Sequence, residues 1–133
     1  MPELPREGSR RSAEARVEEA EGLAELEQAV RVSKRNTLWL GQLGEAYAMA
    51  GQTEKAREIL EELHTRARTE YVSPYHFAYV YTGLGETEQA LDWLERAVEK
   101  RTGPTYGIGA SFLLAPLRQH PRFQALLKEM KLA

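Results

Sequence analysis

A ten-residue segment of this chain returns 34 residues later with most of its character intact. Residues 51–60 read GQTEKAREIL, and residues 85–94 read GETEQALDWL. The positions that are identical across this offset include Gly51/Gly85, Thr53/Thr87, Glu54/Glu88, Ala56/Ala90, Leu60/Leu94 and, just outside the segments, Tyr47/Tyr81 and Glu61/Glu95. A fixed period of this length is typical of helical solenoids, in which each repeat is one unit stacked on the next.

Each copy of the segment has the chemistry of a turn between two helices. A glycine after an apolar helical run can adopt the left-handed conformation that ends a helix. A threonine two residues later can cap the next helix, and the glutamate after it suits the positive end of the helix dipole. We therefore expect a helix, a three-residue turn and a second helix in each unit. Thr53 and Thr87 are the predicted N-caps, and the small Ala56 and Ala90 are predicted close contacts between helices.

The two units resemble the tetratricopeptide repeat, whose pattern is W-x2-L-G-x2-Y, then A-x3-F, then P. The matching positions are Leu40, Leu43, Gly44, Tyr47, Ala56 and Leu60 in the first unit, and Pro74, Phe77, Ala78, Tyr81, Ala90 and Leu94 in the second. The departures are Leu40 and Pro74 in place of tryptophan, Ala78 in place of glycine, and Arg68 and Thr102 in place of the closing proline. The resemblance implies an all-α fold, an α-solenoid of antiparallel helix-turn-helix repeats.

The period and its flanks divide the chain into a leader and a single helical repeat domain. We expect a flexible leader over residues 1–12 and the domain over residues 13–133. The predicted parts of the domain are an N-terminal helix at 13–34, repeats at 37–70 and 71–104, and a C-terminal loop with capping helices at 105–133. The repeat helices are predicted at 37–50, 53–67, 74–84 and 87–101, and the last helix at 121–131. The predicted caps of the other helices are Ser12, Asn36, Ser73 and His120, the last a poor capper by type.

The C-terminal part carries a second resemblance. Residues 116–123 (PLRQHPRF), followed by an apolar helix, are similar to the ends of bacterial repeat segments attached to larger signalling proteins. In those proteins, kinase, cyclase or winged-helix DNA-binding modules precede the repeats. The resemblance implies an alternative function, a regulatory C-terminal fragment of such a protein. The last helix should cover the end of the core, with Arg122, Lys128 and Lys131 on a basic outer face.

Composition narrows the classes of function. The chain has no cysteine, which excludes disulfides and thiol chemistry. A net charge of −2 gives no indication of a general nucleic-acid surface, and no apolar run is long enough to span a membrane. We therefore expect a cytoplasmic protein whose partners include neither nucleic acid nor membrane.

Residues with catalytic or metal-binding chemistry occur only in incomplete patterns. Glu61-x-x-His64 is half of a carboxylate-bridged di-iron motif, which needs a second such pair and two further glutamates. Gly107 and Gly109 begin a dinucleotide-binding fingerprint, but the third glycine and the preceding strand are missing. We therefore expect no enzyme activity, no cofactor and no metal site.

The predicted binding site follows from the family resemblance. First helices of successive tetratricopeptide repeats line a concave face, which here would carry Gln42, Glu45, Met49, Tyr75, His76, Tyr79 and Thr82. We predict that this face binds a peptide or helix of a partner protein, with Tyr75 and Tyr79 as outward aromatic anchors. The titration of His76 predicts weaker binding of a basic partner near pH 6. The lysine, asparagine and arginine that clamp a peptide's C-terminal carboxylate in some repeats of this family are absent from the face.

Two alternatives stay open from the sequence. The C-terminal segment could fold over Tyr75 and Tyr79, which would place both rings in the core, where Tyr47 and Tyr81 are expected in either case. The chain could also be a self-assembling homo-oligomeric scaffold, for example a homodimer. Helix 13–34 matches only the second half of a repeat, and solenoids with fewer than three repeats cover their core poorly.

Overall fold

The computed structural model describes residues 7–100 and 112–129, with side chains for residues 18–98 and 114–129. Within these residues all regular secondary structure is helical, and there is no strand. The elements are α1 (Glu7–Val32), α2 (Thr37–Met49), α3 (Thr53–Arg66), α4 (Pro74–Gly83), α5 (Thr87–Lys100), the 3-10 helix η2 (Phe112–Leu117) and α6 (Pro121–Glu129). The all-α prediction is confirmed.

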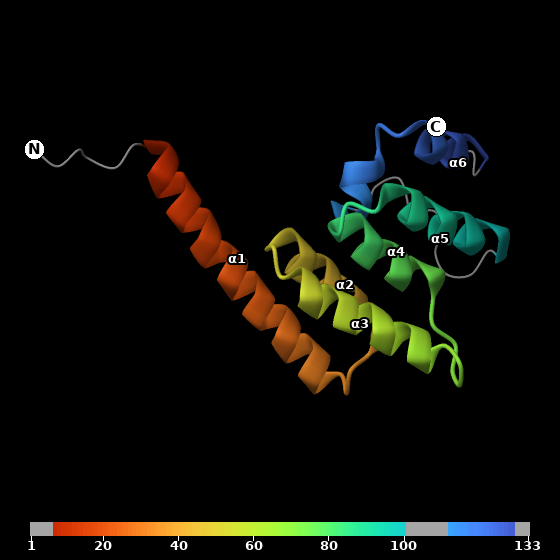
Figure 1. Cartoon of the computed structure of the whole chain (residues 1–133), viewed down its shortest axis with the longest axis horizontal. Coiled ribbons are helices and arrows are strands. Elements are labelled where there is room, and N and C mark those ends of the chain that lie inside the picture. The colour runs from red at the N-terminus through yellow and green to blue at the C-terminus, as the bar shows by residue number, and fades with distance from the viewer. Residues whose placement is uncertain (1–6, 101–111, 130–133) are drawn as a thin grey trace, which may run out of the picture.

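The helices pack as two antiparallel pairs between a long first helix and a short last one (Figure 1). In the first pair α2 packs on α3, and in the second α4 packs on α5. The pairs are joined chiefly through α2 and α4, the first helix of each unit. At one end α1 packs on α2, and at the other η2 packs on α4 and α6 on α5.

The first helix begins earlier than the sequence predicted. Residues 7–12 belong to α1, so the prediction of a flexible leader is wrong for them, while residues 1–6 lie outside the described part. Ser12 is therefore inside the helix and does not cap it. The last proline before this helix is Pro5, so no proline interrupts the added turns, although Gly8 and Ser9 are poor helix formers.

The two repeat turns follow the glycine prediction closely. Gly51 and Gly85 have φ angles of 83° and 75°, in the left-handed region. In each turn the N–H after the glycine bonds to the carbonyl five residues earlier, Gln52 to Tyr47 at 2.8 Å and Glu86 to Tyr81 at 3.0 Å. This is the Schellman pattern that closes a helix at its C-terminal end.

The threonine caps predicted in these turns are wrong by one residue. Gln52 is the N-cap of α3, and its side chain makes no capping bond, while Thr53 is the first helical residue. Thr87 is likewise the first residue of α5. The cause is the short turn, because the residue that closes one helix through its N–H is also the residue from which the next helix starts.

The caps predicted at Asn36, Ser73 and His120 are formed. Asn36 Oδ1 accepts from the Leu38 N–H at 2.9 Å, and Ser73 Oγ accepts from the Tyr75 N–H at 3.3 Å, with Pro74 at the first helical position. His120 also caps its helix, because its Nδ1 accepts from the Arg122 N–H at 3.1 Å. That acceptance leaves the ring proton on Nε2, which lies 3.2 Å from Glu88 Oε1.

The turn from α1 to α2 is built differently from the repeat turns. Lys34 and Arg35, with φ angles of 56° and 60°, occupy the left-handed region that glycine takes elsewhere in the chain. A side chain in this conformation costs free energy. The Arg35 backbone is held by its N–H, which donates to Val30 O at 2.7 Å, and by its carbonyl, which accepts from Arg66.

Two connected clusters of buried side chains form the core. The first lies among α1, α2, α3 and the start of α4, and the second lies between α4, α5, η2 and α6. Ala56 and Ala90 have no exposed surface, as expected for close contacts. Phe77 links the two clusters, because it belongs to the first and its ring stacks on Trp93 of α5, which packs against both, with centroids 4.1 Å apart and an interplanar angle of 11°. Tyr47 is buried, and Tyr81 is half-buried between the clusters.

The last helix is fastened to α5 by one arginine. Arg122 donates to Glu88 at 2.5 Å, to Asp92 at 2.8 Å and to Glu95 at 2.8 Å, three carboxylates on successive turns of α5. Beside these bonds Phe123 and Leu126 are buried against α5. The prediction that α6 covers the core is confirmed. Arg122 does not belong to a basic outer face, whereas Lys128 is exposed and Lys131 lies outside the described residues.

Candidate functional site

The helices α2 and α4 cross with almost no space between their backbones. A Cβ atom added at Gly41 would stand 2.9 Å from the backbone oxygen of His76, and one added at Gly83 would stand 2.7 Å from the backbone oxygen of Glu45. Both distances are shorter than real Cβ contacts, so only glycine permits this approach. The outer faces of the two helices therefore form one continuous surface, the α2–α4 face.

The seven residues predicted for the concave face differ widely in exposure. Glu45, Tyr75 and Thr82 are buried, with exposed fractions of 3%, 8% and 5%. Gln42, His76 and Tyr79 are half-buried, and Met49 is 64% exposed. The structure thus brings the predicted residues together along α2 and α4, but it leaves only part of the set at the surface.

Tyr75 is not the outward anchor that the spacing suggested. Its ring belongs to the second core cluster, together with Leu114 and Leu117 of η2, and Tyr79 packs against the same cluster. The physical reason is the C-terminal segment, because η2 folds back onto α4. The alternative left open by the sequence is therefore correct for Tyr75. Thr82 is satisfied within its own helix, since its hydroxyl donates to Ala78 O at 2.7 Å.

The environment of His76 removes its expected titration near pH 6. Burial lowers the pKa of the ring to about 4. Its Nδ1 lies 3.0 Å from the hydroxyl oxygen of Thr37, and its ring centroid is 6.3 Å from that of Tyr79. The imidazole is therefore neutral at pH 6, and the pH dependence predicted from it is wrong.

Two buried polar atoms on this face have no hydrogen-bond partner, the Oε1 of Glu45 and the hydroxyl of Tyr75. Burial raises the pKa of Glu45 to about 8, so the carboxyl group is mostly protonated at neutral pH. Buried polar groups are almost always hydrogen-bonded in proteins. Two polar atoms of the α2–α4 face therefore lack the hydrogen-bond partners that buried groups normally have. The sequence pattern did not indicate where such atoms would lie.

A second candidate lies between α1, α2 and α3, where the sequence indicated no site. A cavity of about 610 Å³ is lined by Ala24, Glu27, Val30, Arg31, Arg35, Leu43 and Tyr47. A smaller one of about 290 Å³ shares Arg35, Leu43 and Tyr47 with it. The hydroxyl of Tyr47 donates to Glu27 at 2.7 Å, and its pKa is raised to about 12, chiefly by burial.

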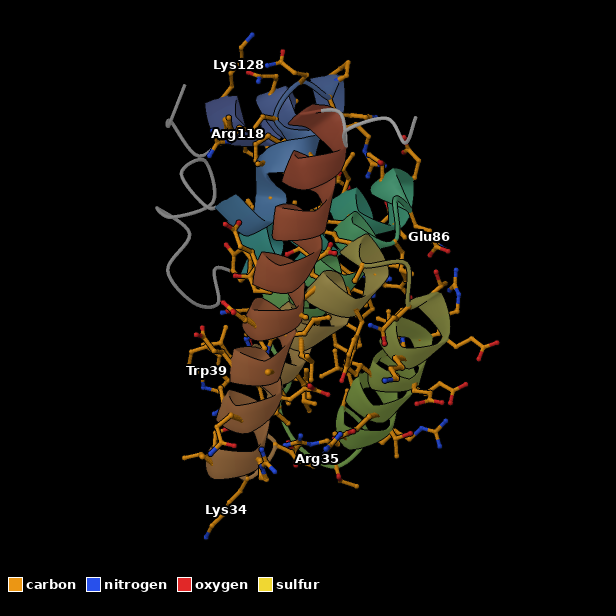
Figure 2. All side chains as sticks on the ribbon, turned by 90° about the vertical axis from the view of Figure 1, so that its left-hand side faces the viewer. Lys34, Arg35, Trp39, Glu86, Arg118 and Lys128 are labelled. Atoms are coloured by element: carbon orange, nitrogen blue, oxygen red, sulfur yellow. The ribbon has the colours of Figure 1, made fainter. Side chains whose placement is uncertain are left out.

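One ion pair, Arg35 with Glu62, lies at the rim of these cavities. Arg35, labelled in Figure 2 at the turn below α1, donates from Nε to Glu62 Oε2 at 3.0 Å. The rim carries Glu27, Glu58 and Glu62 together with Arg31, Arg35 and Lys55. Because the rim carries charges of both signs, it selects neither a cationic nor an anionic ligand. The cavities therefore specify the chemistry of a ligand less well than the α2–α4 face does.

The described residues contain no cluster of three or more histidine, cysteine, aspartate or glutamate side chains suited to a metal ion. The ring of His64, from the Glu61-x-x-His64 pair, lies 4.7 Å from that of Phe77.

None of the helices in the described ranges is long and apolar enough to cross a membrane.

Comparisons with protein-family models, with curated proteins and with solved structures gave no match to this chain.

Proposed function

We propose that this chain is a protein-interaction module of the tetratricopeptide-repeat type, which binds a peptide or helix of a partner protein on the α2–α4 face. The observation that carries the proposal is the close crossing of α2 and α4 at Gly41 and Gly83. This crossing joins the first helices of two 34-residue units into one surface. A shared surface built from successive units is how repeat proteins bind extended partners.

The accessible part of the face is mainly apolar. Leu38, Gln42 and Met49 follow one another along α2, and Leu38 and Met49 are 36% and 64% exposed. The half-buried rings of His76 and Tyr79 continue the surface on α4. Methionine and aromatic side chains are enriched at protein interfaces. The expected partner segment therefore presents apolar side chains to this face.

Affinity capture with matched variants tests the proposal. The immobilised chain captures partners from a lysate of its source cells, mass spectrometry identifies them, and the purified partner is used for affinity measurements. Met49→Asp places a charge on the face and should weaken binding at least about tenfold, the scale of an interface hot spot. Val32→Asp is the control, because Val32 is 70% exposed but belongs to α1. Unchanged affinity of the Met49 variant would contradict the proposal.

Self-association is a second candidate, favoured by the length of α1. This helix has 26 residues and packs on α2, which has 13, so about 20 Å of its ~39 Å extends beyond its neighbour. The overhang is visible at the N-terminal end in Figure 1. Light scattering over a range of concentrations distinguishes a monomer from a homodimer. The alternative of a regulatory fragment of a signalling protein stays a prediction, tested by the reading frame upstream of Met1.

A further inference from the structure

The carboxyl group of Glu45 lies in a buried environment that disfavours polar and charged groups. Its side chain is 97% buried, and one of its oxygens has no hydrogen-bond partner. Burying a polar group without a partner disfavours the folded state, and burying a charge disfavours it more. Thr82, the other buried polar residue of the face, is fully accommodated by its own helix. Together with the Tyr75 hydroxyl, Glu45 thus remains unexplained on the α2–α4 face, and Glu45 is the one of the two that can carry a negative charge at neutral pH.

The position of Glu45 beside α4 adds to this cost. The residue lies directly against Gly83, the last residue of α4, so closely that a Cβ at Gly83 would stand 2.9 Å from Glu45 Cγ. The C-terminal end of a helix carries a partial negative charge, which repels an anion and attracts a cation. A carboxylate at this point requires either a proton or a positively charged neighbour.

Among the described residues, none that neighbours Glu45 provides a positive charge. Burial raises the pKa of Tyr79 and the charge of Glu45 raises it further, and Tyr75 on the same helix has its own hydroxyl without a partner. His76 is neutral at physiological pH, because burial lowers its pKa to about 4. Burial is the cause of the raised pKa of Glu45, with no compensating cation. The carboxyl group of Glu45 is therefore neutralised by a proton, although a cation could neutralise it instead.

A cation would reach the carboxyl group from the solvent side of α2, where two side chains flank Glu45. Gln42 precedes Glu45 by about one helical turn and Met49 follows it by one, and these side chains are half-buried and 64% exposed. Methionine is unbranched and adapts its conformation readily. Movement of Met49 would open a path between α2 and Tyr79 for a slender side chain such as lysine or arginine.

We propose that Glu45 is the recognition point for a cationic group, an ammonium or a guanidinium, carried by the partner segment that binds the α2–α4 face. This inference rests on the proposed function and adds the chemistry of the partner to it. The cation displaces the proton, pairs with the carboxylate, and meets the favourable end of α4 beside Tyr79. Apolar side chains of the partner cover Leu38 and Met49, so the partner is an apolar segment with one buried basic residue.

A titration with small probes tests the cation site without the partner. The chain is labelled with ¹³C at the glutamate carboxyls, and the apparent pKa of Glu45 is measured by NMR with n-butylguanidinium or with n-butylurea, a neutral probe of similar shape. Butylguanidinium should lower the apparent pKa of Glu45 by about one pH unit or more, as an adjacent opposite charge does, whereas butylurea should not. Glu58, exposed on α3, is the internal control. Equal responses of Glu45 and Glu58, or of Glu45 to both probes, would overturn the inference.

Affinity measurements with the captured partner distinguish this inference from the proposed function. Glu45→Gln keeps the shape of the side chain and removes its charge, so it should weaken binding of the captured partner at least tenfold. If Met49→Asp weakens binding and Glu45→Gln does not, the face binds the partner and the cation site is wrong. If neither variant changes the affinity, the proposed function at this face fails, and the guanidinium titration alone decides whether Glu45 takes a cation.

Discussion

The two ends of the helical stack are closed to different degrees. At the C-terminal end, the nine-residue α6 buries Phe123 and Leu126 and is held by Arg122 to three carboxylates of α5. At the N-terminal end, the much longer α1 buries Val30, keeps Leu23 and Leu26 half-exposed, and leaves cavities against α2 and α3. Burial and charge pairing, rather than helix length, therefore determine how firmly a terminal helix closes the core.

The same leucine-to-alanine substitution at each end should test this difference in closure most directly. Leu126→Ala removes a side chain that is 4% exposed, and we expect a loss of about 2–5 kcal/mol in the free energy of unfolding. Leu26→Ala removes a half-buried side chain of α1 and should cost less than half as much. Urea unfolding followed by circular dichroism measures both losses. Equal losses would show that the two ends are equally well closed.

The centre of the stack supplies a pH dependence. The pKa of Glu45 rises from 4.5 to about 8 on folding, so the folded chain holds this proton more tightly than the unfolded chain. The contribution to stability is complete below about pH 4.5 and is lost as the pH rises to 8. Glu45→Met keeps an unbranched side chain without a charge and should stabilise the fold by about 1–3 kcal/mol at pH 8. It should have little effect at pH 4, which unfolding curves at both pH values measure.

The ion pairs at the two ends provide a finer comparison. Arg122→Met removes an arginine shared by three carboxylates, and we expect a loss of about 1 kcal/mol at low salt, because networks exceed single exposed pairs. Arg35→Met breaks a pair with Glu62 in which the arginine side chain is 57% exposed, and its loss should be smaller. Both losses should shrink in 1 M salt. A larger effect at Arg35 would reverse the order of the two ends.

The smallest expected effect is a gain at the N-terminal end. Lys34→Gly relieves a left-handed lysine, and it should raise the free energy of unfolding by about 0.5 kcal/mol, the balance between backbone strain and the entropy of glycine. Lys55→Gly is the control, since Lys55 is exposed within α3 and the same change should lower stability by about 0.5–1 kcal/mol. Thermal unfolding of both variants measures the difference. A loss at Lys34 would mean that its conformation is not strained.

The turns that recur with the 34-residue period could be predicted from the sequence, whereas the close crossing of α2 and α4 could not. Gly51 and Gly85 are related by the period, and their turns have the expected geometry. Gly41 and Gly83 are not, because Tyr75 and Met49 stand at the corresponding positions, so the close crossing of α2 and α4 had no signal in the pattern.

The exposure of the site was harder to predict than its location. The period correctly assigned Tyr75 to α4, but the burial of its ring depends on η2, which lies outside the repeats. The cap made by His120 was predicted from its position before Pro121, although imidazole is a poor capper by type. Contacts that join the repeats to a non-repeating segment need three-dimensional information.

The stacking of Phe77 on Trp93 has a spectroscopic consequence. Trp93 has the guanidinium of Arg96 4.4 Å from its ring centre as well as Phe77 stacked on it, so its fluorescence depends on the docking of α5 against α4. The other tryptophan of the chain, Trp39, is half-buried on α2 beside the first core cluster. Each half of the molecule thus carries its own fluorophore. Single-tryptophan variants, made by Trp39→Phe or Trp93→Phe, can report separately on the loosening of either half.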